Sequence, residues 1–190
     1  KYGVKIMMNR EASEMSMLND QWEITFKNGV GIQADYVCIA SGGYQKSIQF
    51  DWLKKSGHKT AEPVPSLFSF NIPGNVITSL MGISVEKAQV KIIGSKLYEE
   101  GPLLITHWGM SGPAILKLSA WGARELALKN WQFGIIVNWL PAYHEQTLKD
   151  KFQQVRFEIA SQKISNRNPF ALPQRLWEYL LQQSGVNENI

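Results

Sequence analysis

Hydrophobic and polar residues alternate along the first forty positions in the way that strands do. The segment Trp22 to Phe26 has the period of a half-buried strand, and a Lys-Asn-Gly turn follows it. The segment Val4 to Met8 shows a similar alternation. A further strand is predicted over Ile32–Ile39, and because Tyr36-Val37-Cys38-Ile39-Ala40 is nearly all apolar, this strand is expected to be buried on both faces, as in a parallel sheet. This first part of the chain is therefore predicted to be β-structure that ends at Gly42 and Gly43.

The middle of the chain mixes strands with helices, and the end is helical. Leu148, Phe152, Val155 and Ile159 recur at helical spacing, which predicts one apolar helix face. The elements predicted after Gly43 are a helix over Phe50–Ser56, strands over Leu67–Ile72 and Val85–Gly94, a turn at Gly101-Pro102, a strand over Leu103–Thr106, a helix from Pro113 to about Leu128, a strand over Trp131–Leu140, and helices over Tyr143–Ser161 and after Pro173. This order predicts an α+β fold, with candidate boundaries near Gly43 and Pro141.

Composition narrows the function classes. The chain has 190 residues, of which 44% are hydrophobic and 19% charged, as in ordinary folded domains. Its 20 basic and 16 acidic residues are interspersed, and the net charge of +4 is too small to predict nucleic-acid binding. No run approaches the roughly 20 apolar residues of a membrane span. The chain starts at Lys1 within an apolar pattern, so we expect a piece of a longer protein without a visible signal peptide.

Cysteine and histidine usage gives no metal signature. The single cysteine, Cys38, excludes an internal disulfide and a Cys-cluster metal site, and its apolar surroundings predict a core position. A reducing, cytoplasmic location is therefore expected. The three histidines, His58, His107 and His144, are scattered and include no pair at helical spacing for a shared metal, so no metal site is predicted.

Two glycine-containing segments early in the chain are candidate ligand sites. Gly29-Val30-Gly31-Ile32-Gln33-Ala34 matches the dinucleotide fingerprint in letters, but it lies between two predicted strands and not before a helix. A hairpin is the better interpretation. Ala40-Ser41-Gly42-Gly43 ends a predicted buried strand, where glycines permit close approach of a ligand. A plain turn after the strand is the alternative there.

The segment from Thr106 to Pro113 combines a strand end, glycines and a helix start. Backbone N–H groups at a helix start can bind an anion or a polarised oxygen. His107 is a candidate proton donor because an unperturbed imidazole titrates near neutral pH, and Ser111 is a second candidate catalytic residue. The plain alternative is that Ser111 caps the helix. A serine hydrolase is a weak interpretation, because the segment lacks the complete nucleophile-elbow motif.

These segments resemble the bacterial FAD-dependent flavoproteins of the YhiN/BaiN type, which are also described as NAD(P)/FAD-dependent or aminoacetone-oxidase-like. The matching segments are Asp35 with Ala40-Ser41-Gly42-Gly43, then Gly57-His58, Pro63-Val64-Pro65-Ser66-Leu67, the block from Glu100 to Pro113, and Ile136 to Pro141. The resemblance runs in order over most of the chain. The block Thr106-His107-Trp108-Gly109-Met110-Ser111-Gly112-Pro113 is its most specific part.

The resemblance implies an architecture. It places the end of a first FAD-domain β segment at residues 1–43, a distorted antiparallel β-barrel insert at 44–140, and a small helical subdomain at 141–190. Two departures from the family pattern are Ser41 in place of threonine, and the segment from Tyr44 to Trp52 in place of a glycine-rich stretch. The glycine-rich motif that holds the FAD pyrophosphate is absent from the 190 residues.

The resemblance also implies a function. The chain would be the middle portion of a flavin-dependent oxidoreductase, with FAD carrying the chemistry in the longer protein and this portion inactive by itself. Ala40, Ser41, Gly42 and Gly43 would contact the cofactor, and Thr106, Trp108 and Gly109 would line the substrate pocket beside His107 and Ser111. The expected partners are a small-molecule substrate and NAD(P)H, with no nucleic acid and no membrane. The alternative is a non-catalytic interaction or substrate-recognition domain.

Overall fold

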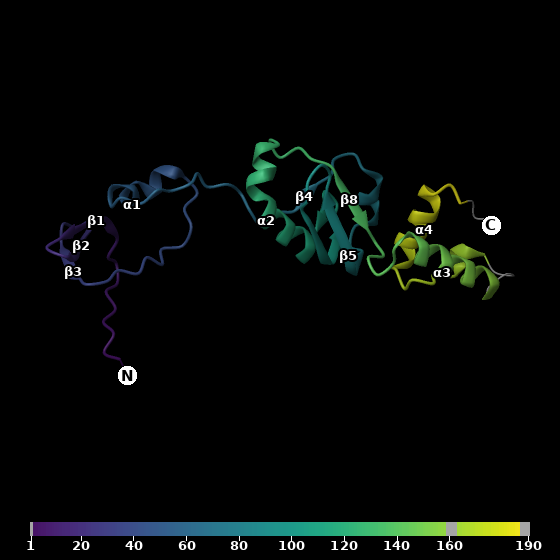
Figure 1. Ribbon diagram of the computed structural model, residues 1–190, viewed down its shortest axis with the longest axis horizontal. Coiled ribbons are helices and arrows are strands. Elements are labelled where there is room, and N and C mark those ends of the chain that lie inside the picture. Colours follow the sequence, from purple (N-terminus) through teal and green to yellow (C-terminus); the bar gives the residue numbers. More distant parts are fainter. Residues whose placement is uncertain (1, 159–162, 187–190) are drawn as a thin grey trace. The chain divides into compact units, whose positions relative to one another are not determined.

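The computed structural model describes residues 2–158 and 163–186, and these form two compact units, Lys1–Pro63 and Val64–Ile190. The fold is α+β, as predicted. Every strand pair among the described residues is antiparallel. Figure 1 shows the helices and strands in chain order.

The first unit is a small three-stranded sheet with one short helix. Its strands are β1 (Ala12–Leu18), β2 (Gln21–Phe26) and β3 (Gly31–Ala34), in that order in the sheet. Met15, Ile24 and Phe26 form its core. The 3-10 helix η1 (Ser47–Phe50) leads into α1 (Asp51–Lys55), which agrees with the predicted short helix. The glycine turn at Gly29 joins β2 to β3, so the hairpin interpretation of the fingerprint-like segment is confirmed.

Three predictions for the first unit are wrong. The segment from Val4 to Met8 contains no strand, and Val4 is 80% exposed. The predicted buried strand over Ile32–Ile39 is reduced to the edge strand β3, and residues 35–43 have no regular structure. Cys38 is exposed and not in a core. The physical reason is common to all three: an apolar run is buried only where neighbouring strands cover it, and the described strands do not cover this one.

The second unit is built on a curved five-stranded sheet. The strands are β4 (Phe70–Asn71), β5 (Ser84–Ile92), β6 (Tyr98–Ile105), β7 (Gly109–Ser111) and β8 (Ile135–Asn138), in the sheet order β4-β7-β6-β5-β8. The 3-10 helix η2 (Val76–Leu80) precedes β5. Helix α2 (Pro113–Leu128) has the predicted bounds and begins with Pro113 at its first turn. It packs across β6, β5 and β7. Its buried face contributes Ala114, Ile115, Leu118, Ser119, Gly122, Ala123 and Leu126.

The predicted turn at Gly101-Pro102 is wrong, because both residues lie inside β6. The pairing of β5 with β6 shifts between Val85 and Ala88, opposite this position. A proline lacks the N–H that a regular ladder needs, and such a bulge is where a strand tolerates it. The Gly101-Pro102 pair thus does mark an irregular position, but the irregularity is a shift in strand pairing and not a turn.

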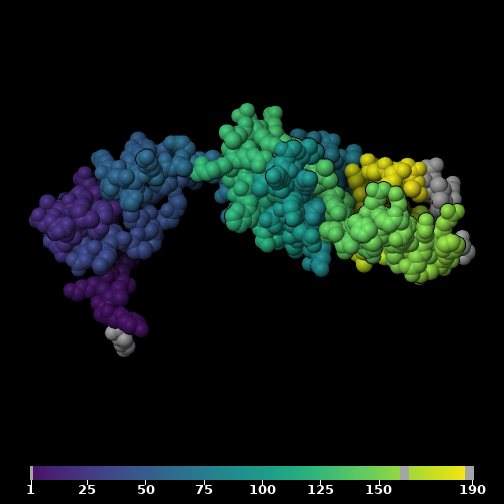
Figure 2. Space-filling model, viewed as in Figure 1, coloured from purple at the N-terminus to yellow at the C-terminus, as the bar shows by residue number. Residues whose placement is uncertain are grey.

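The end of the second unit is helical, in line with the prediction. Helix α3 (Glu145–Glu158) is followed by the 3-10 helix η3 (Ile164–Asn166) and by α4 (Gln174–Gln183). The predicted extension of α3 over Ile159 to Ser161 lies outside the described residues. Phe170 packs edge-to-face on Phe152 of α3, with ring centroids 5.3 Å apart, and contacts Trp177 of α4 at 5.8 Å. These ring contacts join the two helices. The yellow-green and yellow segments that contain α3 and α4 lie next to each other in Figure 2.

Candidate functional site

The candidate loop is a tight hairpin between β6 and β7. The N–H of Thr106 donates to the carbonyl of Gly109 at 2.8 Å, and the N–H of Gly109 donates to the Thr106 carbonyl at 3.3 Å and to Thr106 Oγ1 at 3.1 Å. His107 and Trp108 are the two residues between this pair. Both are exposed, and their rings meet edge-to-face at 4.2 Å. The loop therefore presents an imidazole and an indole to solvent.

Two glycines make this hairpin possible. Gly109 has φ +157°, and a Cβ there would overlap the carbonyl oxygen of Phe70 on β4. Gly112 has φ +101°, and a Cβ there would lie 2.8 Å from the Pro102 carbonyl oxygen. The backbones approach too closely for any side chain. The glycines of the family-like block thus have a structural role in bringing β7 between β4 and β6.

Ser111 is engaged in the sheet. Its Oγ accepts a hydrogen bond of 2.8 Å from Oγ of Ser69, and it lies opposite Leu104 on β6. The N-cap of α2 is Gly112 and not Ser111, so the capping interpretation is wrong. The hydroxyl partner of Ser111 in the described chain is another serine. This geometry offers no support for an activated nucleophile, which needs a base in hydrogen-bond reach.

The proposed cofactor-contacting residues lie in the first unit. Ala40, Ser41, Gly42 and Gly43 are exposed and without regular structure. A Cβ built at Gly42 or Gly43 would meet no atom within 4 Å. A dinucleotide needs a cradle of closely approaching backbone. These four residues do not form such a cradle within the described chain, so they do not fit FAD by themselves.

Sequence reasoning missed an aromatic cleft in the second unit. Its volume is about 780 Å³, which lies in the range of ligand pockets. It lies between the two edge strands of the sheet, β4 and β8, and reaches Tyr179 of α4. Its lining consists of Pro65, Phe68, Ser69, Phe70, Asn71, Ile72, Pro73, Asn75, Ile77, Met110, Trp131, Phe133, Gly134, Ile135, Val137, Trp139 and Tyr179. The alternation of apolar and polar residues from Trp131 to Trp139 was the available signal.

A second cleft lies between η2, η3 and α4, and it is basic on balance. Lys163, Arg175 and Glu178 line it together with Ser79 and other residues, and its volume is about 860 Å³. The guanidinium of Arg175 donates to the Ser79 carbonyl at 2.8 Å, which fixes this cation beside η2. Tyr179 lines both clefts. The two clefts therefore adjoin along α4.

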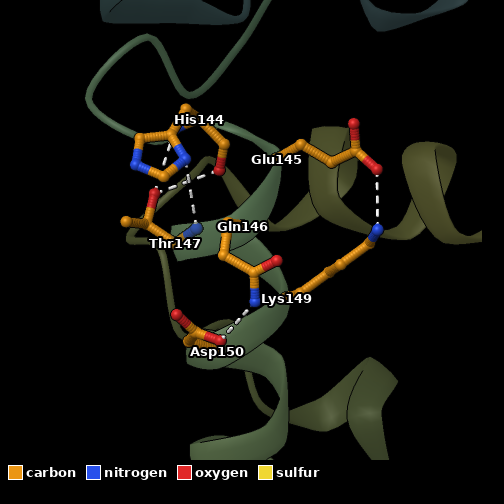
Figure 3. A network of polar contacts seen from close by, with 6 residues as sticks. All are labelled: His144, Glu145, Gln146, Thr147, Lys149 and Asp150. Atoms are coloured by element: carbon orange, nitrogen blue, oxygen red, sulfur yellow. Dashed lines mark hydrogen bonds and ion pairs between the residues drawn. The ribbon is translucent and has the colours of Figure 1, made fainter.

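The start of α3 is capped by a histidine and a threonine (Figure 3). The N–H of His144 donates to Thr147 Oγ1 at 3.0 Å, and the N–H of Thr147 donates to His144 Nδ1 at 3.4 Å. This is the reciprocal arrangement of a capping box, with histidine in the N-cap place. Two i,i+4 pairs add to the first turns, Lys149 with Glu145 at 2.6 Å and Gln146 with Asp150 at 2.9 Å. His144 thus has a structural role.

Residues 2–158 and 163–186 contain no group of three His, Cys, Asp or Glu side chains close enough to share a metal ion. None of the helices described has both the length and the apolar composition to cross a bilayer.

Comparison with known proteins gives two findings. Residues 64–190 match the family described as HI0933-like protein barrel and H2TH domain. The whole chain also aligns with the Ribosomal RNA dihydrouridine synthase of Haemophilus influenzae, with 25% identity over 208 residues. The alignment covers 100% of this chain and 47% of that protein, so the chain spans about half the length of this relative.

The second finding corrects the expected partners. The sequence analysis expects a small-molecule substrate and no nucleic acid, but the relative is named for ribosomal RNA. The expectation relies on the net charge of the entire chain. Such an average is insensitive to local arrangements, such as Lys163 and Arg175 in one cleft.

Proposed function

Because the chain belongs to the family of HI0933-like proteins with a barrel and H2TH domain, we propose that it is the barrel and helical portion of a flavin-dependent oxidoreductase that reduces uridine in RNA. The observation that carries the proposal is the alignment of the whole chain with a Ribosomal RNA dihydrouridine synthase. Under this proposal residues 1–43 end a first FAD-domain segment, 44–140 contain the barrel insert, and 141–190 form the helical subdomain.

The proposed reaction adds a hydride and a proton across the C5=C6 bond of a uracil ring, and the two electrons come from a reduced donor. FAD, which the family resemblance implies for the longer protein, supplies hydride transfer when it is bound. Residues 40–43 would contact it only together with segments beyond this chain.

The residues of this chain would position the substrate and donate the proton. The hairpin of Thr106, His107, Trp108 and Gly109 would form a wall of the substrate pocket. An exposed imidazole such as that of His107 suits a proton donor in this reaction. Ser111 would support the hairpin through its bond to Ser69 rather than react.

The test is deletion of the full-length gene in its host, followed by mass spectrometry of nucleosides from ribosomal RNA. We expect dihydrouridine at one or more sites to disappear and to return when the full-length gene is restored. Unchanged dihydrouridine in the deletion strain would contradict the proposal. The alternative of a non-catalytic recognition domain would then be favoured.

A further inference from the structure

The two edge strands of the barrel sheet face each other without pairing. Among the described strands, β4 pairs with β7 and β8 pairs with β5. Side chains bridge the gap instead: Phe68 meets Trp131 edge-to-face at 5.4 Å, and Phe70 meets Phe133 at 5.0 Å. Both contacts join residues two apart on each segment, so the two segments run in parallel register. These ring contacts join the segment Phe68–Phe70 to the segment Trp131–Phe133, and residues of both segments line the aromatic cleft.

The segment from Phe133 to Trp139, which includes β8, lines the cleft with alternate side chains. Phe133, Ile135, Val137 and Trp139 line the cleft at every second position. Ile136 and Asn138 are not part of the lining, and Ile136 is 56% exposed, whereas Gly134, which has no side chain, also borders the cleft. The opposite wall adds polar groups from Ser69, Asn71 and Asn75. Flat apolar walls with a few hydrogen-bonding groups suit a planar, polar-edged ligand.

Trp131 is held in an unusual backbone conformation at the mouth of this cleft. Helix α2 ends at Leu128, and after its C-cap Lys129 come Asn130 at φ +51° and Trp131 at φ +60°. The N–H of Trp131 donates to the Leu126 carbonyl at 3.0 Å, and that of Asn130 to the Ala127 carbonyl at 3.0 Å, which is a Schellman cap. A left-handed conformation is costly for a bulky residue. Trp131 remains 40% exposed, so the cost is not offset by full burial.

The adjoining basic cleft supplies charge of the right sign for a phosphate backbone. Of the residues that the structure describes, it is lined by the cations Lys163 and Arg175 and by the carboxylate of Glu178. Tyr179 connects it to the aromatic cleft. Aromatic stacking surfaces beside cations are the arrangement with which proteins bind single-stranded nucleic acid.

We propose that the aromatic cleft between β4 and β8 binds an unpaired base of single-stranded RNA, with the adjoining phosphate over the basic cleft at Lys163 and Arg175. The proposal rests on the proposed RNA substrate. The RNA would then bind in the aromatic cleft of the second unit, whose lining does not include His107.

The test measures binding of a fluorescein-labelled RNA of eight uridines to the 190-residue chain by fluorescence anisotropy at low salt. We expect Trp131→Leu to raise the Kd about tenfold, the loss of one stacked base. The matched control is Trp121→Leu, since Trp121 is 77% exposed on α2 and lies outside the cleft lining. The control should bind as the unchanged chain does. An RNA duplex of the same length should bind more weakly than the single strand.

A second variant distinguishes the loss of an RNA contact from misfolding of the chain. Asn71 is exposed and lines the cleft, so Asn71→Ala should leave the circular dichroism spectrum unchanged and still weaken binding. Absence of RNA binding by the unchanged chain, or equal binding by all three variants, would overturn the proposal. So would cleft-dependent binding that disappears in the full-length protein, because another segment would then cover the cleft. None of these three results depends on the gene-deletion assay, so the proposed binding site and the proposed function can fail separately.

Discussion

The backbone N–H of Phe68 donates a hydrogen bond of 2.9 Å to Oγ of Ser119, a residue 51 positions later in the sequence. Ser119 is fully buried in α2, and its Oγ donates in turn to the Leu116 carbonyl at 2.8 Å. This bond ties the segment that carries the cleft residues Phe68 and Phe70 to the central helix. A polar side chain in the core therefore positions one wall of the aromatic cleft.

Removal of this hydroxyl should destabilise the second unit. Ser119→Ala leaves the Phe68 N–H without its partner, which should lower the free energy of unfolding by about 1–3 kcal/mol. Urea denaturation measures the change. The control is Ser84→Ala on the exposed start of β5, which should shift the free energy by less than about 0.5 kcal/mol. Equal urea midpoints for the two variants would contradict the role of Ser119.

The hairpin glycine Gly109 should not tolerate a side chain. Gly109→Ala places a Cβ onto the Phe70 carbonyl oxygen, so we expect a loss on the order of 4 kcal/mol or a failure to fold. Gly94→Ala is the matched control: Gly94 also has positive φ, +72°, but a Cβ there meets nothing within 4 Å. It should cost only about 1–2 kcal/mol. If thermal unfolding gives both variants the same stability, close backbone approach is not the reason for Gly109.

Trp177 should anchor α4 to the rest of the unit. It is 3% exposed, and its Nε1 donates to the Ile164 carbonyl at 3.1 Å. Trp177→Phe removes the donor and leaves a gap, so the free energy of unfolding should fall by about 2 kcal/mol. Trp121→Phe, at a 77% exposed site, should be nearly neutral. A chemical denaturation series on both variants tests the difference, and a neutral Trp177→Phe would refute the anchor role.

The cap of α3 should depend on the Thr147 hydroxyl. Thr147→Val removes the acceptor for the His144 N–H, and we expect the helix to lose about 1 kcal/mol of stability. Hydrogen exchange of the amides in the first turn of α3 measures this loss directly. Thr147→Ser keeps the hydroxyl and should restore most of the protection. Equal exchange rates in both variants would show that the cap contributes little.

His107 should matter for turnover if it donates the proton in the proposed reduction. In the full-length protein, reduced with dithionite and mixed with ribosomal RNA, His107→Gln should lower the single-turnover rate by about 100-fold. His58→Gln changes another exposed histidine and should leave the rate unchanged. RNA binding by the two variants should be equal, which separates a proton role from substrate binding. A His107→Gln rate equal to that of the control would remove His107 from the mechanism.

Local signals in the sequence were sufficient for some elements. Helix α2 is found where it is predicted, because Pro113 at its start and apolar residues at helical spacing act within the segment itself. The hairpin at Gly29 is likewise local. The block from Thr106 to Pro113 was recognised by its match to the family pattern, and the structure supplies a physical reason for its glycines at 109 and 112. The roles of His107 and the other candidate site residues stay predictions.

The sequence by itself determined the α+β class, the helical end of the chain and the family resemblance, since periodicity and turn chemistry depend on near neighbours. Only the tertiary structure decided which apolar segments are covered. Cys38 is exposed because the described strands do not cover it, although its neighbour Val37 packs against the core of the first unit. Phe68 and Trp131 are far apart in the sequence, but their rings meet beside β4 and β8, the two end strands of the sheet. The cleft depends on those contacts between distant segments, which cannot be read from local patterns.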